Sequence, residues 1–261
     1  MFQSTPFTVL HIPHHSTVIP SDIRPTLLLT DVELALEILT MTDHDTADLF
    51  NLGVDARRII HPVSRLVLDP ERFVDDSQEV MASRGVGVIY TQTSTQKALR
   101  VVPSADVRQQ LIERYYIPHH TTLTNAVDES LVEHGFCLLI DCHSFPAHPL
   151  WFDLDQSPAR PQICIGTDEF HTPQGLLEFV GHQFQAQGFS VKVNQPYSGT
   201  IVPSKHYRVT GSVWSLMIEI NRAVYMDEQS GQQLAGFSHF ANQLQTILRD
   251  VQEYVASRWR R

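Results

Sequence analysis

The run FCLLIDCHS at residues 136–144 restricts the fold of this chain more than any other stretch. Its first five residues are all apolar, without the alternation of apolar and polar positions that marks a half-exposed strand. A continuous apolar strand is typical of the centre of a parallel sheet, which helices cover on both faces. The polar residues Asp141 and His143 stand near its carboxyl end. We therefore expect a buried central strand that ends in reactive side chains.

Strand and helix patterns alternate along the rest of the chain. Short β-rich or apolar runs predict strands at residues 7–14, 57–63, 86–91, 162–166, 189–194 and 213–221. Helical spacing of apolar residues predicts helices at 30–41, 45–50, 104–134, 173–188 and about 232–261. In the first of these, Thr30 and Glu33 form a capping-box pattern, and Val32, Ala35 and Leu36 recur at helical spacing. Pro118 is expected to break or kink the helix at 104–134.

This alternation predicts an α/β fold with a mixed, largely parallel sheet flanked by helices on both faces. The 261 residues contain no internal repeat and no long linker, so we expect a single domain over residues 1–261. Its last part is the amphipathic helix at about 232–261. In such folds, ligands bind beyond the carboxyl ends of the strands.

The composition excludes several classes of function. A formal net charge of −10 argues against nucleic-acid binding, which needs a basic face. The N-terminal residues lack the pattern of a signal peptide, and no apolar run is long enough to cross a membrane, so we expect a cytoplasmic protein that binds no membrane. Cys137, Cys142 and Cys164 lie in apolar runs and are expected to be reduced core thiols. The oligomeric state stays open.

Polar residues stand at the ends of three predicted strands: His14 and His15 on the first, Asp141 and His143 on the central one, and Glu219 and Arg222 on the late one. If the strands share a sheet, these ends meet at one edge. A catalytic zinc site needs three protein ligands and one open position, and two histidines with a carboxylate are a frequent set. The carboxylate comes from the segment TDHDTADLF, where Asp43, Asp45 and Asp48 are all open candidates. The alternative is that these histidines are only packed side chains.

Six segments in this order resemble the motifs of the N-formylglutamate amidohydrolase family: IPHHSTVIP, SRLVLDPERF, YYIPHHTTL, LLIDCHSFP, VNQPYSGTIV and LMIEINRAVYMDE. The resemblance runs from about residue 9 to about residue 228. It implies a fold similar to that of the zinc carboxypeptidases. It also implies hydrolysis of an N-formyl amino acid, most simply N-formylglutamate, to formate and the free amino acid.

The resemblance also implies roles for individual residues. The metal ligands fall on His14, Asp43 and His143, which would hold one divalent ion, expected to be zinc, and the catalytic carboxylate falls on Glu219. Arg65 and Arg222 are candidates for stabilising the developing negative charge or for binding a substrate carboxylate; the alternative is an ion pair with a buried acid, such as Asp69 for Arg65. Further candidates for contact with a small anionic substrate are Asn194, Tyr197, His120, His15, Lys205 and His206.

The sequence departs from the family pattern at several positions. His15-Ser16 stands where Ser-Gly is common, Ala47 takes the place of a second acid, and Ser198 that of a glycine. His119 replaces an aromatic residue. The reaction class is therefore better defined than the substrate. Three alternatives remain: hydrolysis of another N-acyl amino acid or small peptide, a carboxypeptidase-like or cell-wall enzyme, and a non-catalytic protein that binds a metal or ligand.

Overall fold

The computed structural model describes residues 6–259 and contains a six-stranded sheet in the order β2-β1-β3-β6-β4-β5. All neighbouring strands are parallel except β4 and β6, which are antiparallel, so the predicted mixed and largely parallel sheet is confirmed. The strands are β1 (Thr8–Ile12), β2 (Arg57–Ile60), β3 (Cys137–Phe145), β4 (Ile163–Gly166), β5 (Val191–Val193) and β6 (Val213–Asn221). The central strands β3 and β6 coincide with the apolar runs at residues 136–144 and 213–221.

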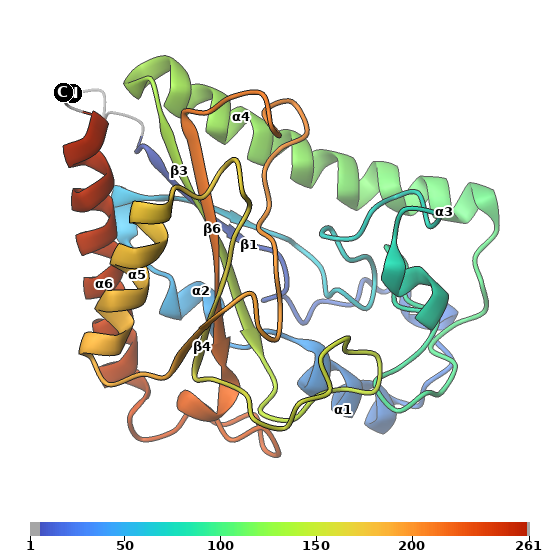
Figure 1. The fold of residues 1–261 in the computed structure, drawn as a ribbon. Helices are drawn as coiled ribbons and strands as arrows, with labels where there is room; N and C mark the ends of the chain where they lie inside the picture. The colour runs from blue at the N-terminus through green and yellow to red at the C-terminus, as the bar shows by residue number, and fades with distance from the viewer. Residues whose placement is uncertain (1–5, 260–261) are drawn as a thin grey trace.

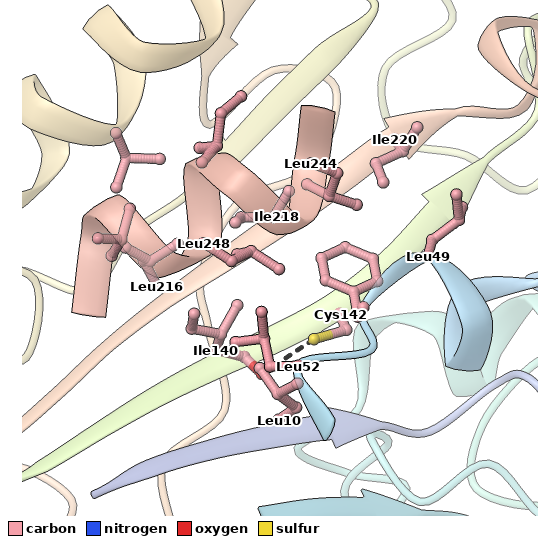
Figure 2. Packing of buried hydrophobic residues seen from close by; sticks show 14 of the residues in the cluster. Leu10, Leu49, Leu52, Ile140, Cys142, Leu216, Ile218, Ile220, Leu244 and Leu248 are labelled. Atoms are coloured by element: carbon pink, nitrogen blue, oxygen red, sulfur yellow. Dashed lines mark hydrogen bonds between the residues drawn. The ribbon is translucent and has the colours of Figure 1, made fainter. Parts of the chain in front are cut away.

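One face of the sheet packs against α5 (Gln174–Ala186) and α6 (Phe237–Trp259), which lie side by side in Figure 1. Figure 2 shows Leu244 and Leu248 of α6 close to Leu216 and Ile218 of β6. The short helix α2 (Thr46–Leu49) closes the same core. The final helix begins later than about residue 232, the position expected from the sequence, because the chain still forms a turn before Phe237.

On the opposite face of the sheet, the side chains change from apolar to polar along the strands. Near their amino ends, Val9, Cys137 and Leu139 pack against α4 (Ile117–His134), which crosses this side of the sheet in Figure 1. Further along, the same face of β3 carries Asp141 and His143. Because side chains on one face recur every second residue, a single strand supplies both the apolar contact with α4 and the polar residues beyond it.

The helix α1 (Asp31–Met41) has both hydrogen bonds of the predicted capping box. However, Val32 and Leu36, whose spacing indicates the helix in the sequence, are exposed. Leu34 and Met41 face the core instead, together with the carboxylate of Glu37, which accepts hydrogen bonds from the backbone and side chain of Ser94. The period of the pattern therefore identifies the helix but not its buried face.

One local prediction is wrong, and another agrees with the structure in part. Residues 86–91 form no strand, although Val86, Val88 and Ile89 are buried, because this segment packs as an irregular loop under other side chains. The helix at 104–134 does not end at Pro118, but its α-helical geometry is interrupted just before this residue: α3 (Ala105–Leu111) continues through a π-helical turn, Ile112–Tyr116, into α4. The wider turn accommodates the missing N–H of Pro118. Gly135 ends α4 with φ 78°, as expected.

Short 3₁₀ helices complete the described chain, at Arg24–Thr26, Gly53–Asp55, Val80–Arg84 and Arg222–Val224. None of the helices within residues 6–259 is both long and apolar enough to cross a membrane.

Candidate active site

The register of the sheet brings four polar side chains to one face. His11 of β1 lies beside Asp141 of β3, and His143 of β3 lies beside Glu219 of β6. Side chains alternate along a strand, and partners in register point to the same side, so all four residues share a face. Each of them is buried. The sheet alone therefore gathers two imidazoles and two carboxyl groups.

Loops bring two further residues next to His143. Asp43 lies between α1 and α2, and its N–H donates to the carbonyl oxygen of His14, just after β1, over 3.0 Å. Asp43 Oδ2 lies 3.3 Å from His143 Nδ1 and 3.7 Å from His14 Nδ1. One ligand atom from each of these three residues lies within 4.8 Å of the other two. Asp45 borders a different cavity, and Asp48 is exposed on α2.

Carboxylates face the outer nitrogen, Nε2, of each histidine, and at His143 Glu71 Oε2 also lies 3.1 Å from this nitrogen. His14 Nε2 lies 2.8 Å from Asp69 Oδ1, and His143 Nε2 lies 3.0 Å from Asp141 Oδ1. Because a carboxylate only accepts hydrogen bonds, each Nε2 carries a proton, and Nδ1 is the atom that presents a lone pair whenever the ring is neutral. His14 Nδ1 is buried and has no hydrogen-bond partner within the described chain. This set of two nitrogens and one carboxylate fits a divalent cation such as zinc.

Arg222 holds Asp43 in place. Its Nη2 donates to Asp43 Oδ1 over 3.0 Å, and its Nη1 donates to the Thr40 carbonyl oxygen over 2.5 Å. Burial alone would raise the pKa of Asp43, but the neighbouring imidazoles of His14 and His143 and the charge of Arg222 hold this pKa well below its ordinary value. Asp43 is therefore an ionised carboxylate, and the guanidinium of Arg222 is largely occupied by it.

Glu219 has different surroundings from Asp43. It is buried, and its Oε2 has no hydrogen-bond partner among the residues that the structure describes. Burial raises the pKa of Glu219 to about 8. A carboxyl group with a pKa near neutrality can both accept and donate a proton, as a general acid–base catalyst must.

These residues line one wall of a cavity of about 620 Å³. Asp43 and Glu219 border it together with four residues predicted from the sequence, which are Arg65, His120, Tyr197 and Arg222. The aromatic rings of Phe73, Tyr116 and Phe145 form much of the remaining wall. A cavity of this size accommodates a small molecule, and its mixed apolar and charged lining is typical of a ligand site.

Residues 7–226 match the N-formylglutamate amidohydrolase family. The chain belongs to this family. A crystal structure of an N-formylglutamate amidohydrolase from Ralstonia eutropha JMP134 has a similar fold, with a TM-score of 0.85, 24% sequence identity, and coverage of 98% of this chain and 96% of that one. No curated protein gives a significant match. Family membership and this neighbour together indicate an amidohydrolase.

A gene product from Agrobacterium tumefaciens has the same fold more distantly. Its TM-score is 0.64 at 16% identity, with coverage of 95% of this chain and 92% of that chain. At 24% and 16% identity, the two solved structures support the fold of this chain but do not define its substrate.

Four of the residues expected to contact substrate do not line the cavity of about 620 Å³ described above. His15 borders a second cavity with His44 and His61. The Asn194 side chain exchanges hydrogen bonds with Thr167. Lys205 and His206 both bind the carboxylate of Asp128 on α4. A sequence motif identifies such residues as near the site, but the loop conformation decides where each side chain points.

Arg72 is a cavity residue that is not among those expected from the sequence to contact the substrate. This residue lines the cavity, and its Nε is buried without a hydrogen-bond partner in the described chain. The nearest carboxylate oxygens, on Asp69 and Glu79, are each 3.8 Å away. Arg65, by contrast, forms the ion pair with Asp69 that the sequence suggested as an alternative, at 2.8 Å. The signal for Arg72 was its place in the family segment SRLVLDPERF, seven residues after Arg65.

Proposed function

We propose that this protein is a metal-dependent amidohydrolase that cleaves N-formyl amino acids with an acidic side chain, with N-formylglutamate as the foremost substrate. The single observation that carries the proposal is the meeting of His14 Nδ1, His143 Nδ1 and Asp43 Oδ2 on the wall of the cavity that Glu219 also lines. This combination of three ligand atoms and a nearby carboxyl group is typical of hydrolytic zinc sites.

His14, Asp43 and His143 are the residues that would hold the ion. A bound divalent ion supplies a Lewis acid, which polarises a carbonyl group and lowers the pKa of water. Asp69 and Asp141 keep the two imidazoles turned so that their Nδ1 lone pairs face Asp43. Arg222 keeps the carboxylate of Asp43 ionised and fixed.

Glu219 is the proposed general base and acid. It accepts a proton from water as the water oxygen adds to the formyl carbon of the substrate. It then donates this proton to the amide nitrogen as the C–N bond breaks, so that formate and the free amino acid leave. A pKa of about 8, raised by burial, suits both transfers near neutral pH.

Arg72 is the proposed partner of a substrate carboxylate. The nearest carboxylate oxygens lie 3.8 Å from its guanidinium, beyond hydrogen-bond distance, whereas the groups of Arg65 and Arg222 donate hydrogen bonds to Asp69 and Asp43. Guanidinium groups bind carboxylates through two parallel hydrogen bonds. Arg65 lies in the same wall of the cavity and adds positive charge there. With Arg65 and Arg72 both in the cavity lining, a substrate that carries a second carboxylate besides its α-carboxylate matches the charge of the cavity better than one that carries the α-carboxylate alone.

The test is the release of formate from N-formylglutamate by the purified protein, before and after removal of metal with a chelator and after re-addition of zinc. We expect activity that chelation removes and zinc restores. A Glu219→Gln variant should bind zinc as the wild type does but turn over about 10²–10⁴-fold more slowly. Full turnover of this variant would exclude Glu219 as the base.

Related amides define the substrate. N-acetylglutamate and N-formylglutamine are the matched compounds, because the first changes only the acyl group and the second removes only the side-chain charge. Equal turnover of N-acetylglutamate would indicate a broader N-acyl amidohydrolase. Zinc binding without turnover of any amide would instead indicate a non-catalytic member of the family.

A further inference from the structure

A chain of hydrogen-bonded side chains continues behind the candidate metal centre. Asp141 Oδ1 lies 3.0 Å from His143 Nε2 and 2.8 Å from His11 Nδ1. His11 Nε2 lies 2.8 Å from Nε2 of His119, on α4. None of His11, Asp141 and His119 is more than 5% exposed, so the chain is shielded from water. In the sequence, His11 lies inside the run at residues 7–14 that predicts the first strand.

We propose that His11 is a positioning residue: through Asp141 it holds His143 in the tautomer whose Nδ1 faces the metal ion, and His119 holds His11 in the same way. This inference rests on the metal centre of the proposed function. It assigns a task to two buried histidines that contact neither the substrate cavity nor the ligand atoms of that centre.

The positions of the protons follow from the contacts. Asp141 accepts from the Ile201 N–H through Oδ2, over 3.1 Å, and its Oδ1 faces a nitrogen of each of two imidazoles. An ionised carboxylate has no proton to give, so both His143 Nε2 and His11 Nδ1 must be the donors. His11 Nε2 then presents a lone pair, which accepts the N–H of His119 Nε2. The position of each proton in this series of hydrogen bonds thus determines the position of the next proton. The nitrogen left with a lone pair at the end of the series is His143 Nδ1.

His119 is suited to the end of this chain. Its ring packs edge-on against His61, with ring centroids 4.9 Å apart. Burial and the nearby imidazoles of His11 and His61 lower the pKa of His119, so that the ring is neutral and carries one N–H. A neutral donor to His11 Nε2 disfavours the other tautomer of His11, which would place two N–H groups against each other.

The alternative is that His11 is itself a metal ligand. Ligand atoms of His11, Glu71 and Asp141 also lie within 4.8 Å of one another. However, the 2.8 Å separation of His11 Nδ1 from Asp141 is that of a hydrogen bond, and Glu71 Oε1 is more distant at 3.6 Å. The geometry therefore favours positioning over ligation, and metal stoichiometry separates the two.

The test compares zinc affinity, measured by competition with a chromogenic chelator, between the wild type and two variants of His11. Asparagine can place its amide nitrogen near the position of the imidazole Nδ1, so His11→Asn keeps the donor to Asp141, whereas His11→Leu removes it. Loss of an outer hydrogen bond to a metal-binding histidine weakens binding by about 10–100-fold, which is the effect expected for His11→Leu. His11→Asn should restore most of the affinity.

His119→Phe is a second variant in case His11→Leu does not fold. It keeps an aromatic ring against His61 and removes only the donor to His11 Nε2, so a smaller loss of zinc affinity is expected. His171→Leu is the matched control: His171 is also buried and hydrogen-bonded through both ring nitrogens, but to Val213 and Arg208. It should lower thermal stability and leave zinc affinity unchanged.

Several outcomes would overturn the proposal. One is equal zinc affinity in the wild type and in a folded His11→Leu variant. Another is equal weakening by His11→Asn and His11→Leu, which would indicate only a packing role. Two zinc ions per wild-type chain, falling to one in His11→Leu, would make His11 a ligand. If the wild type binds zinc but releases no formate, the proposed function fails while the difference between the two His11 variants still tests the positioning role.

Discussion

Individual histidines in this protein differ in which ring nitrogen is held. At His14 and His143 a buried carboxylate binds Nε2, and Nδ1 faces Asp43. At His11 both nitrogens are hydrogen-bonded. Residue type alone does not distinguish these cases, because a neutral imidazole offers one donor and one acceptor that can exchange positions. The neighbouring carboxylate makes the distinction.

At the scale of a residue, Arg72→Met is predicted to weaken substrate binding. The methionine keeps much of the apolar length of the side chain and removes the charge. Loss of a charge-assisted hydrogen bond costs about 1.5–3 kcal/mol, so KM for N-formylglutamate should rise by about 10–100-fold. Steady-state kinetics should show kcat changed much less than KM, because Arg72 has no part in the proposed proton transfers.

Arg114→Met is the matched control for this prediction. Arg114 forms an ion pair with Asp22 at the surface, outside the cavity lining. This variant should keep the KM of the wild type. If Arg72→Met also keeps it, the substrate carboxylate is bound by another group, and Arg65 becomes the next candidate.

At the scale of an element, the place of the site depends on the alternation of side chains along the strands and on the position of helix α4. On β3, Leu139 packs against α4, while Asp141 and His143 lie on the same face closer to the carboxyl end. The site therefore begins where the contacts of α4 with this face change from apolar residues such as Leu123 to His119. α4 must end and turn back into β3 at a fixed point, and Gly135 makes that turn with a positive φ.

Gly135→Ala is therefore predicted to destabilise the protein by about 1 kcal/mol, the cost of a left-handed backbone conformation in a residue with a Cβ. A Cβ at this position would contact no atom within 4 Å, so steric overlap adds nothing. Urea unfolding should show a lower midpoint with an unchanged slope. Gly211→Ala provides the control, because Gly211 also has open space around it but no positive φ; a comparable loss there would mean that backbone strain is not the cause.

At the scale of the whole molecule, every thiol of the chain is buried in the central sheet. Cys137, Cys142 and Cys164 are all 0% exposed, on β3 and β4. Burial raises the pKa of Cys137 to about 12 and that of Cys164 to about 11. Thiolates react and thiols do not, so both burial and pKa protect these residues.

We predict that a thiol reagent at pH 8 labels the native protein only as fast as the sheet opens. In urea the same reagent should label all three cysteines. The number of labelled thiols against time, followed by mass spectrometry, tests this. Rapid modification of one cysteine in the native protein would show that the fold opens locally around that residue.

Zinc is predicted to stabilise the entire fold, because its ligands come from three separate parts of the chain: the end of β1, the loop before α2, and β3. An ion that binds only the native state adds about 2.7 kcal/mol at a concentration of 100 times Kd. The melting temperature should rise by about 5–10 °C for a chain of this size. The increase should vanish in His143→Asn and persist in His182→Asn, whose side chain is exposed on α5. An equal increase in both variants would place zinc elsewhere.

The sequence by itself determined the central strands, the largely parallel sheet and the family, because these depend on local apolar runs and on ordered motifs. The expected ligand residues His14, Asp43 and His143 also came from those motifs. Only the tertiary structure decided that Arg72 lines the cavity with no carboxylate oxygen closer than 3.8 Å, that Lys205 turns to Asp128, and that His11 is hydrogen-bonded to Asp141. These facts depend on strand register and loop conformation, which set the contacts of a side chain and are not recorded in the spacing of residues along the chain.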